Sequence, residues 1–308
     1  MENMGKDLTD YMNRQRLNQR FNKLVEEALQ DPDVQAFIQA NQAALSQETV
    51  ARSAAKIYEY VNGKKKILNG ETTLAPGYAP KLVLSNHFID VSYEPTADLV
   101  QKRAQAELKA RVKSINMPKD IVEASLTHYD ASERQVPLIE ALKFVEAYRQ
   151  APTDFHQGLY LSGQFGVGKT YLLGAIANEL ALQGFETTLI HFPTFAVEMK
   201  NAIGQNNVLE KVNQIKKAPI LMIDDIGADA LSAWVRDEVL GIILQYRMQE
   251  QLATFFSSNF TMNELEKHLT TSQRGDEEPV KAGRIMQRVR YLAREVEVSG
   301  QNRRLQSN

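Results

Sequence analysis

The sequence feature that most constrains the fold of this chain is a glycine-rich octapeptide near its centre. Residues 163–170 read Gly-Gln-Phe-Gly-Val-Gly-Lys-Thr and match the phosphate-loop pattern G-x-x-x-x-G-K-[ST] at every fixed position. Glycines at these positions let backbone N–H groups approach phosphate oxygens closely, and a helix that begins there directs its positive end at the anion. The pattern therefore predicts a strand–loop–helix unit that binds the phosphates of a nucleotide.

The residues on either side of the octapeptide support this interpretation. An apolar run, Gly158-Leu-Tyr-Leu, precedes it, and a helical run begins at Tyr171. A glycine-rich turn that matched by chance would need neither neighbour. We expect Lys169 to reach the β and γ phosphates of ATP, and the Thr170 hydroxyl to hold Mg²⁺. The predicted nucleotide-binding residues are Gly163, Gln164, Phe165, Gly166, Val167, Gly168, Lys169, Thr170 and Tyr171.

Short apolar runs alternate with helical stretches from residue 117 onward. The runs begin at Leu159, Thr188, Pro219, Thr254 and Glu295. Strands separated by helices form βαβ units, and such units build a parallel sheet with helices on its faces. The fold class predicted for residues 117–308 is therefore α/β, a P-loop ATPase domain in which a parallel sheet is flanked by helices.

Two of these runs end in polar residues. The run from Ile220 ends in Asp224 and Asp225, and a later run ends in Asn259. Because the carboxyl ends of parallel strands face the ligand crevice, we expect Asp224 to coordinate Mg²⁺ and Asp225 to orient and polarise an attacking water. Asn259 is a candidate contact for the γ phosphate or that water. The alternatives are an aspartate pair that caps the next helix and an asparagine that only forms a turn.

The first 97 residues have a different character and predict a small, mostly helical domain. Asp31-Pro32 is expected to end a first helix, and another helix to follow it. Glycines and prolines punctuate residues 61–97, where Lys81–Leu84 and Phe88–Tyr93 are predicted as short strands. The apolar residues that recur at helical spacing along the first helix are Leu17, Phe21, Leu24 and Ala28.

Residues 98–116 are highly charged and contain neither glycine nor proline, which predicts a solvated connecting helix. Pro118 then opens a new segment. The predicted organisation is an N-terminal domain over residues 1–97, a linker helix over 98–116 and the ATPase domain over 117–308.

Composition excludes several classes of site. The chain has no cysteine, which rules out disulfides and thiolate metal sites, and its five histidines follow no metal-ligand spacing. No run of about 18 apolar residues could span a membrane, and the N-terminus lacks the apolar core of a secretion signal. We therefore expect a cytoplasmic protein with no zinc and no membrane partner. The net charge is −2, but residues 281–308 carry seven Lys/Arg against two Glu.

The motifs form a series: the phosphate loop, Asp224-Asp225-Ile-Gly, Ser257-Ser-Asn259, and an arginine-rich helix near the C-terminus. This series resembles the AAA+ ATPases. Residues 117–308 resemble, more narrowly, the replicative helicase loaders of the DnaC/DnaI group. The similarity to the DnaI type of Gram-positive bacteria is carried by three stretches, which begin at Asp224, at Gln245 and at Thr271. It extends more faintly over residues 1–100.

The resemblance implies an ATPase that binds the replicative DNA helicase through residues 1–97 and helps place it on single-stranded DNA. It also implies other primosome proteins as partners and self-association through AAA+ domains. In relatives the N-terminal domain can hold zinc on cysteines. Because this chain has no cysteine, we expect residues 61–97 to be held by packing alone, with the core candidates Tyr78, Leu82, Phe88 and Tyr93.

By the same resemblance, the arginine-rich helix presents an arginine to the ATP of a neighbouring subunit. We favour Arg288 as this arginine, which is termed an arginine finger, and Arg284 is the second candidate. The two residues are four apart and share one helix face. A cation there stabilises the charge that develops in phosphoryl transfer. Arg303 is expected to contact the γ phosphate of its own subunit. The alternative is a solvated or DNA-facing basic face. We expect Arg236 to be a surface ion-pair residue.

Residues 192–217 correspond, by the resemblance, to a region that helps initiators and loaders bind DNA. Phe195 is a candidate to stack on bases, and Lys200 to contact phosphates. The alternative is that Phe192 and Phe195 lie in the core and Lys200 is solvated.

Three other functions remain open. An IstB-type transposition helper ATPase would have a similar ATPase module, with residues 1–100 contacting a transposase. A small-molecule P-loop kinase would need a second substrate pocket under a lid, for which the sequence gives no sign. A nucleotide-dependent interaction module would not hydrolyse ATP, and Asp225, Asn259 and Arg288 argue against it.

Overall fold

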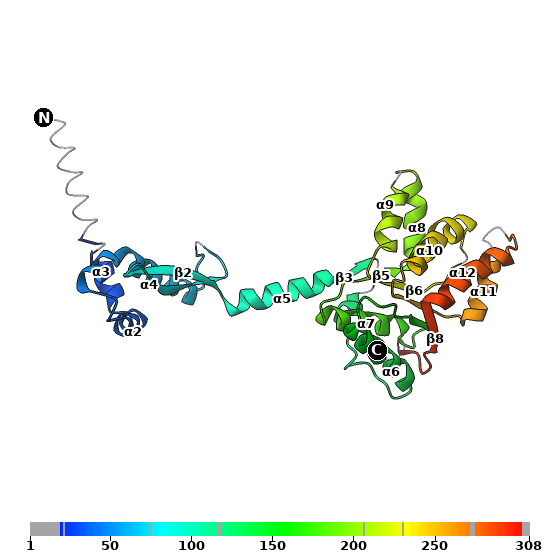
Figure 1. The fold of residues 1–308 in the computed structure, drawn as a ribbon, viewed down its shortest axis with the longest axis horizontal. Coiled ribbons are helices and arrows are strands. Elements are labelled where there is room, and N and C mark those ends of the chain that lie inside the picture. Colours follow the sequence, from blue (N-terminus) through cyan, green and yellow to red (C-terminus); the bar gives the residue numbers. More distant parts are fainter. Residues whose placement is uncertain are drawn as a thin grey trace. The chain divides into compact units, whose positions relative to one another are not determined.

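The computed structural model describes residues 19–20, 22–73, 75–115, 117, 119–205, 207–229, 231–271 and 275–303. The chain forms two compact units that divide after Gln105 (Figure 1). Leu17, Phe21 and Pro118 lie outside the described residues, as do residues 272–274 of the stretch that begins at Thr271.

The first unit is built on three helices, α2 (Pro32–Ala40), α3 (Gln47–Arg52) and α4 (Ala54–Leu68). Residues 22–29 are helical as well, and Asp31 then caps α2 by accepting the N–H of Asp33. The predicted break at Asp31-Pro32 is confirmed, because proline is favoured at the first position of a helix. The buried residues of this core are Ala28, Val34, Ile57, Tyr60, Val61, Leu82 and Ile89.

A hairpin completes the first unit. Strands β1 (Tyr78–Ser85) and β2 (Phe88–Pro95) pair antiparallel and are longer than the two predicted strands. Asn86 and His87 connect them with φ of 48° and 63°, a two-residue turn whose twist matches that of the strands.

The core predicted for this hairpin is largely wrong. Of the four candidates only Leu82 is buried; Tyr78 and Phe88 are half-buried, and Tyr93 is exposed. Side chains alternate along a strand, so Phe88 lies on the opposite face from Ile89, which is buried. The Arg52 guanidinium instead covers the Phe88 ring at 5.0 Å.

Helix α5 (Ala97–Arg111) buries no residue, as the prediction of a solvated helix requires. It ends earlier than predicted, because Val112–Ile115 form strand β3, which pairs in parallel with β5 (Thr187–His191). The hydrogen bonds of the ladder, together with the half-buried side chains of Val112 and Ile115, outweigh the helical pattern of the charged segment. Residues 112–115 therefore belong to the sheet of the second unit.

A six-stranded sheet organises the second unit, and every pair in it is parallel. The strand order is β3-β5-β6-β7-β4-β8. All five predicted strands are present, and the α/β fold class is confirmed. Besides β3 and β5, the strands are β4 (Gly158–Ser162), β6 (Ile220–Asp224), β7 (Thr254–Ser258) and β8 (Ala293–Glu297).

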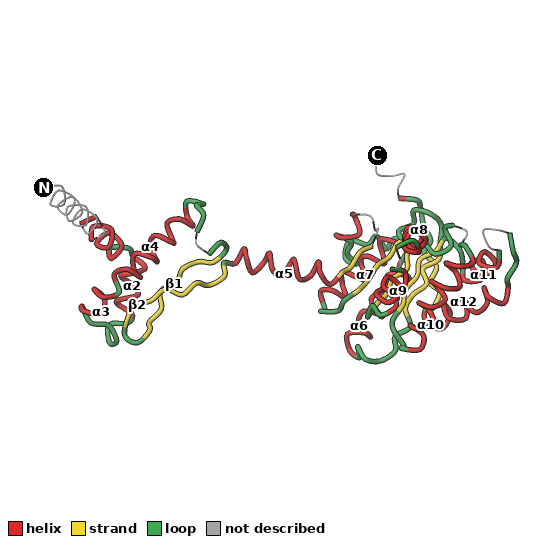
Figure 2. The backbone as a smooth tube through the Cα atoms, turned by 90° about the horizontal axis from the view of Figure 1, so that it is seen from above, coloured by secondary structure: helices red, strands yellow, loops and turns green. Residues whose placement is uncertain are grey.

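Helices cover both faces of this sheet (Figure 2). One face packs against α6 (Gln135–Gln150), α7 (Lys169–Leu182) and the short η1 (Lys119–Glu123). The other face packs against the remaining helices, which are α8 (Phe192–Ile203), α9 (Val208–Lys216), the π-helix η2 (Val235–Leu240), α10 (Gly241–Gln249), α11 (Met262–Thr270) and α12 (Pro279–Leu292). Within the described residues, no helix is both long enough and apolar enough to cross a membrane.

The strand order decides where the predicted site residues lie. Because all strands run in parallel, their carboxyl ends meet at one edge of the sheet. Strands β6, β7 and β4 are consecutive neighbours. The segments that follow them carry Asp225, Asn259 and the phosphate loop, so these three elements converge although they lie up to about a hundred residues apart in sequence.

Candidate nucleotide site

The phosphate loop joins β4 to α7 and depends on glycine at two positions. Gly166 has φ of 76° and Gly168 has φ of 96°, values that other residues rarely adopt. A Cβ atom at Gly166 would come within 1.9 Å of the Asn302 side chain, and one at Gly168 within 2.9 Å of the Arg134 guanidinium. Helix α7 begins at Lys169, so its N-terminal end faces the loop.

The Lys169 ammonium lies inside the concave side of this loop. Its Nζ donates hydrogen bonds to the carbonyls of Gly163 at 2.7 Å and Gln164 at 2.8 Å, and to Asn259 Oδ1 at 2.8 Å. The residue is buried. A buried cation at the N-terminal end of a helix, beside the backbone of a glycine-rich loop, suits a phosphate anion.

Asp224 is the buried carboxylate at the end of β6. Its Oδ1 accepts a hydrogen bond from Thr170 Oγ1 at 2.9 Å and another from Ser257 Oγ at 2.5 Å. Burial raises the pKa of Asp224, and the two hydroxyl hydrogen bonds oppose that rise only in part. A carboxylate beside a threonine hydroxyl offers the hard oxygen ligands that Mg²⁺ prefers, so these residues fit the ion.

Asp225 occupies a strained position next to it, with φ of 60°. Its N–H donates to Ser257 Oγ at 2.9 Å, and its Oδ1 accepts from Asn259 Nδ2 at 3.2 Å. Asn259 therefore contacts both Asp225 and Lys169. The two adjacent carboxylates contact different side chains, although Ser257 links Asp224 to the backbone N–H of Asp225.

The imidazole of His191 adds a partner that the sequence analysis did not single out. His191 ends β5, the neighbour of β6, and its Nε2 lies 3.9 Å from Asp225 Oδ2. Its Nδ1 is 2.8 Å from Thr194 Oγ1. Sequence spacing alone could have found His191, because it closes an apolar run in the way that Asp224 does.

A cavity of about 560 Å³ opens between the phosphate loop and the segment before α6. Tyr129 and Tyr171 stack along it with ring centroids 6.2 Å apart. Arg134 is buried behind them and donates to the Val167 carbonyl at 2.5 Å. Flat aromatic rings beside a phosphate loop suit a nucleobase. Of these residues, sequence analysis missed Tyr129 and Arg134, which carry no motif.

Phe165 and Arg303 lie at the rim of the same cavity. The Phe165 side chain is 65% exposed. Arg303 donates its N–H to the Gly166 carbonyl at 3.1 Å, while its guanidinium forms an ion pair with Asp130. The structure thus brings the Arg303 backbone to the loop and directs its side chain at Asp130, and a contact with the γ phosphate stays a prediction.

The two candidate finger arginines lie on α12, and neither lines the nucleotide cavity of its own chain. Arg288 donates to the Gly241 carbonyl at 2.9 Å, and partial burial together with the nearby Arg284 lowers its pKa. Arg284 is exposed. The finger role of either arginine therefore stays a prediction.

Two expectations outside this site are corrected. Arg236 is an ion-pair residue but lies in the interior, with 1% of its surface exposed; Asp237 and Glu278 neutralise it. Phe192 and Phe195 are buried in the core, so Phe195 cannot stack on bases as it lies, whereas Lys200 is exposed.

Comparison with known proteins gives two family matches. Residues 1–93 match the family described as the N-terminus of primosomal protein DnaI. Residues 81–308 match the family of IstB-like ATP-binding proteins.

Individual proteins agree with both matches. The chain is 39% identical to the replicative helicase loader DnaI of Bacillus subtilis, over 99% of each chain. It is 28% identical to the replicative helicase loader DnaC of Escherichia coli, over 43% of this chain and 53% of that protein.

Two solved structures are similar to about two thirds of this chain. A crystal structure of DnaI covers 64% of this chain and 99% of its own, with 45% identity and a TM-score of 0.55. A crystal structure of a primosome component of Streptococcus pyogenes covers 65% of this chain and 98% of its own, with 40% identity and a TM-score of 0.53.

Proposed function

This chain belongs to the DnaI family of replicative helicase loaders, and from that membership we propose how its two units divide the work. Residues 1–97 bind the replicative DNA helicase. The second unit binds ATP and Mg²⁺, hydrolyses ATP and contacts single-stranded DNA. Other primosome proteins join the assembly, and copies of the second unit associate with one another. The similarity to a loader over 99% of both chains is the observation that carries this proposal.

The hydrogen-bond network at the sheet edge supports binding and hydrolysis of ATP. Backbone N–H groups of the loop and Lys169 would hold the phosphates, while Thr170 and Asp224 would hold Mg²⁺. Bound Mg²⁺ would neutralise charge that develops on the phosphate oxygens. Asp225 would orient the attacking water, and Asn259 links its carboxylate to Lys169.

The position of α12 supports an arginine that acts between subunits. Arg288 of one copy would reach the γ phosphate bound to its neighbour and stabilise charge in the transition state. Arg284 shares its helix face and would add positive potential. Arg303 would then serve the nucleotide of its own chain, after its guanidinium leaves Asp130.

A transposition helper ATPase is less well supported. The IstB-like match begins at residue 81 and leaves out most of the first unit. Residues 1–93 match the N-terminus of a primosomal protein, which a transposase-binding domain would not require.

Complex formation with the replicative helicase of the same organism tests the loader function. The full chain mixed with the helicase and ATP should elute as one complex in gel filtration, and a chain that lacks residues 1–97 should elute separately. ATP binding by the shortened chain is the control, because it shows that this chain is still folded. A full chain that never co-elutes with the helicase would refute the loader function.

A further inference from the structure

Strand β8 is the last strand of the sheet, and one side of its backbone is open. Among the described residues β8 pairs only with β4. The N–H of Val298 donates to the Ser162 carbonyl at 2.7 Å. Because successive N–H groups of a strand point to opposite sides, those of Glu297 and Glu295 point away from β4. Such a row of unpaired groups can hydrogen-bond an additional strand.

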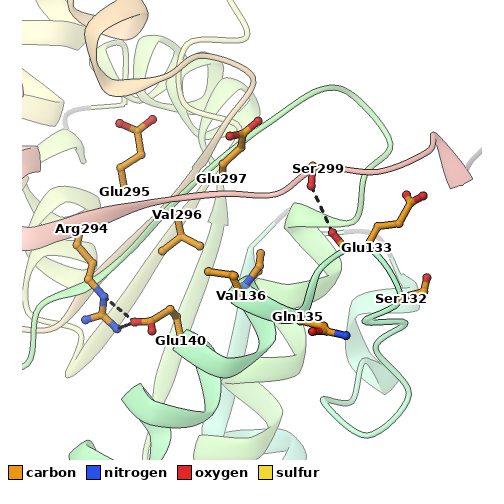
Figure 3. A pocket seen from close by; sticks show the side chains of 11 residues that line it. Ser132, Glu133, Gln135, Val136, Glu140, Arg294, Glu295, Val296, Glu297 and Ser299 are labelled. Carbon is orange, nitrogen blue, oxygen red and sulfur yellow. Dashed lines mark hydrogen bonds and ion pairs between the residues drawn. The ribbon is translucent and has the colours of Figure 1, made fainter.

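A groove of about 740 Å³ runs beside this open edge, between β8 and the beginning of α6 (Figure 3). Val136 and Pro137 of α6 form part of its wall, and 64% of the Val136 surface is exposed. Ile139, one turn further along α6, is also exposed. An extended segment laid along β8 would therefore cover apolar side chains of α6 as well.

The groove is strongly acidic. Four carboxylates line it against a single cation, Arg294, which is already paired with Glu140. The other three carboxylates form no ion pair with a described Lys or Arg; they are Glu133, Glu295 and Glu297. Unlike charges attract over several ångströms at a protein surface, so the groove favours a positively charged occupant.

The two faces of β8 differ in chemistry. Glu295 and Glu297 project from one face of the strand, whereas Arg294 and Val296 project from the other face, toward α6 (Figure 3). A strand added at the edge would carry its own side chains alternately on these two faces. Basic side chains on one face would then lie beside the two glutamates, and apolar side chains on the other beside Val136.

We propose that the groove between β8 and α6 binds an extended segment of a partner protein in which Lys or Arg alternates with apolar residues. The segment adds a strand to the open edge. Main-chain hydrogen bonds supply affinity, and the alternating side chains supply specificity. No residue that lines this groove lines the nucleotide cavity, so the site is separate from the ATPase centre.

Short synthetic peptides with blocked ends test the pattern on the full chain. The probe alternates Lys and Val and carries a fluorophore, and binding is followed by fluorescence anisotropy. One control peptide has the same composition with all Lys before all Val, and another alternates Glu and Val. Only the first peptide should bind well, and its affinity should fall as salt screens the carboxylates. Equal binding of the control peptide in which all Lys precede all Val would overturn the proposal that a strand is added.

Charge variants test the site. The double variant Glu133→Lys with Glu297→Lys should weaken peptide binding about tenfold, because it places like charges against the lysines. Glu295 is left intact because its Oε1 accepts the Met262 N–H at the start of α11. Glu250→Lys, an exposed carboxylate on another element, is the matched control and should leave binding unchanged. Unchanged binding in the double variant would overturn the site.

The main chain can be tested independently. Glu297→Pro removes an N–H that faces away from β4, which an edge strand tolerates, and it should abolish peptide binding while ATP binding persists. In the wild-type chain, amide exchange at Glu295 and Glu297 should slow when the probe binds. If the full chain instead self-associates and Glu297→Lys disperses it, a second copy occupies the edge and the proposal of a basic partner segment is refuted.

Discussion

At the scale of single residues, the nucleotide site is a chain of hydrogen bonds in which donors and acceptors are matched. Thr170 and Ser257 donate to Asp224, Asp225 donates its N–H to Ser257, and Asn259 joins Asp225 to Lys169. Each member has a partner, so the removal of one member exposes a defined group. This makes the roles of neighbouring residues separable by substitution.

Lys169→Ala should weaken ATP binding by about 100-fold or more, because one buried cation is lost from the phosphate site. Titration calorimetry with Mg²⁺ and ATP measures this loss. Lys217→Ala, which removes an exposed lysine of the same unit, should bind ATP normally. Retained affinity in Lys169→Ala would mean that the loop does not bind phosphates.

Asp224→Asn should stabilise the nucleotide-free protein at neutral pH by about 1 kcal/mol, the scale of many stabilising substitutions. Burial raises the pKa of Asp224 in the folded state above that of an unfolded aspartate. Protonation of this carboxyl therefore favours folding, and the stability of the wild type falls as pH rises through the raised folded pKa. Asparagine does not ionise, so the variant does not lose stability as the pH rises.

Urea unfolding without nucleotide, at acidic and at neutral pH, checks this expectation. The gap between Asp224→Asn and the wild type should be small at acidic pH and widen toward neutral pH. The same variant should lose Mg²⁺-dependent ATP binding. A variant that is less stable than the wild type at neutral pH would contradict the argument.

Arg288→Ala should leave ATP binding intact and slow hydrolysis by about 100-fold at concentrations where copies associate. Its guanidinium contacts Gly241 rather than the nucleotide cavity of its own chain. Turnover assays on mixtures can confirm action between subunits: Arg288→Ala mixed with Lys169→Ala should regain part of the activity. Normal hydrolysis by Arg288→Ala alone would exclude it as the finger.

At the scale of elements, the π-helix η2 is tied to the segment before α12 by a cluster of charges around the buried Arg236. Arg236 contacts Asp237 and Glu278 and donates to the Leu269 carbonyl at 3.0 Å. Lys281 of α12 adds a second cation to both carboxylates. These contacts hold α12, the helix that carries Arg288, against the helices that follow β6.

Arg236→Ala should lower the free energy of unfolding by about 3 kcal/mol, because it leaves two partly buried carboxylates without their main partner. Lys281→Ala, which removes the exposed cation of the same cluster, should cost less than about 1 kcal/mol. Chemical unfolding of the two variants compares them directly. Equal losses of unfolding free energy in the two variants would show that burial of Arg236 does not increase its contribution to stability.

At the scale of the whole molecule, the described residues form three hydrophobic cores. One is shared by the helices and hairpin of the first unit, and each face of the parallel sheet of the second unit carries one of the other two. Compact units with cores of their own unfold as separate cooperative transitions when few contacts join them.

Calorimetry of the full chain should therefore show two transitions, and Mg²⁺ with ATP should raise the midpoint of one. At a hundredfold excess over the dissociation constant, the ligand stabilises the unit that binds it by about 2.7 kcal/mol. The other transition should not move. A single transition that shifts as a whole would mean that the units unfold together.

Those parts of the protein that depend on local signals could be predicted from the order of the amino acids. A glycine-rich octapeptide, apolar runs that end in acids, and a proline at a helix start each fix a short stretch through backbone geometry or periodicity. They predicted the five strands, the phosphate loop and the α/β fold. They also predicted that Asp224, Asp225 and Asn259 lie at one edge, since parallel strands end on one side.

The residues that complete those parts depend on contacts between segments that are distant in the chain. Strand β3 forms because an open sheet edge offers hydrogen bonds to a segment whose own pattern is helical. Tyr129 and Arg134 reach the nucleotide site through packing, which leaves no motif in the chain. Burial of Arg236 likewise depends on Glu278, which lies 42 residues away in the sequence. Local sequence sets what a segment can form, but contacts between distant segments set what each side chain meets.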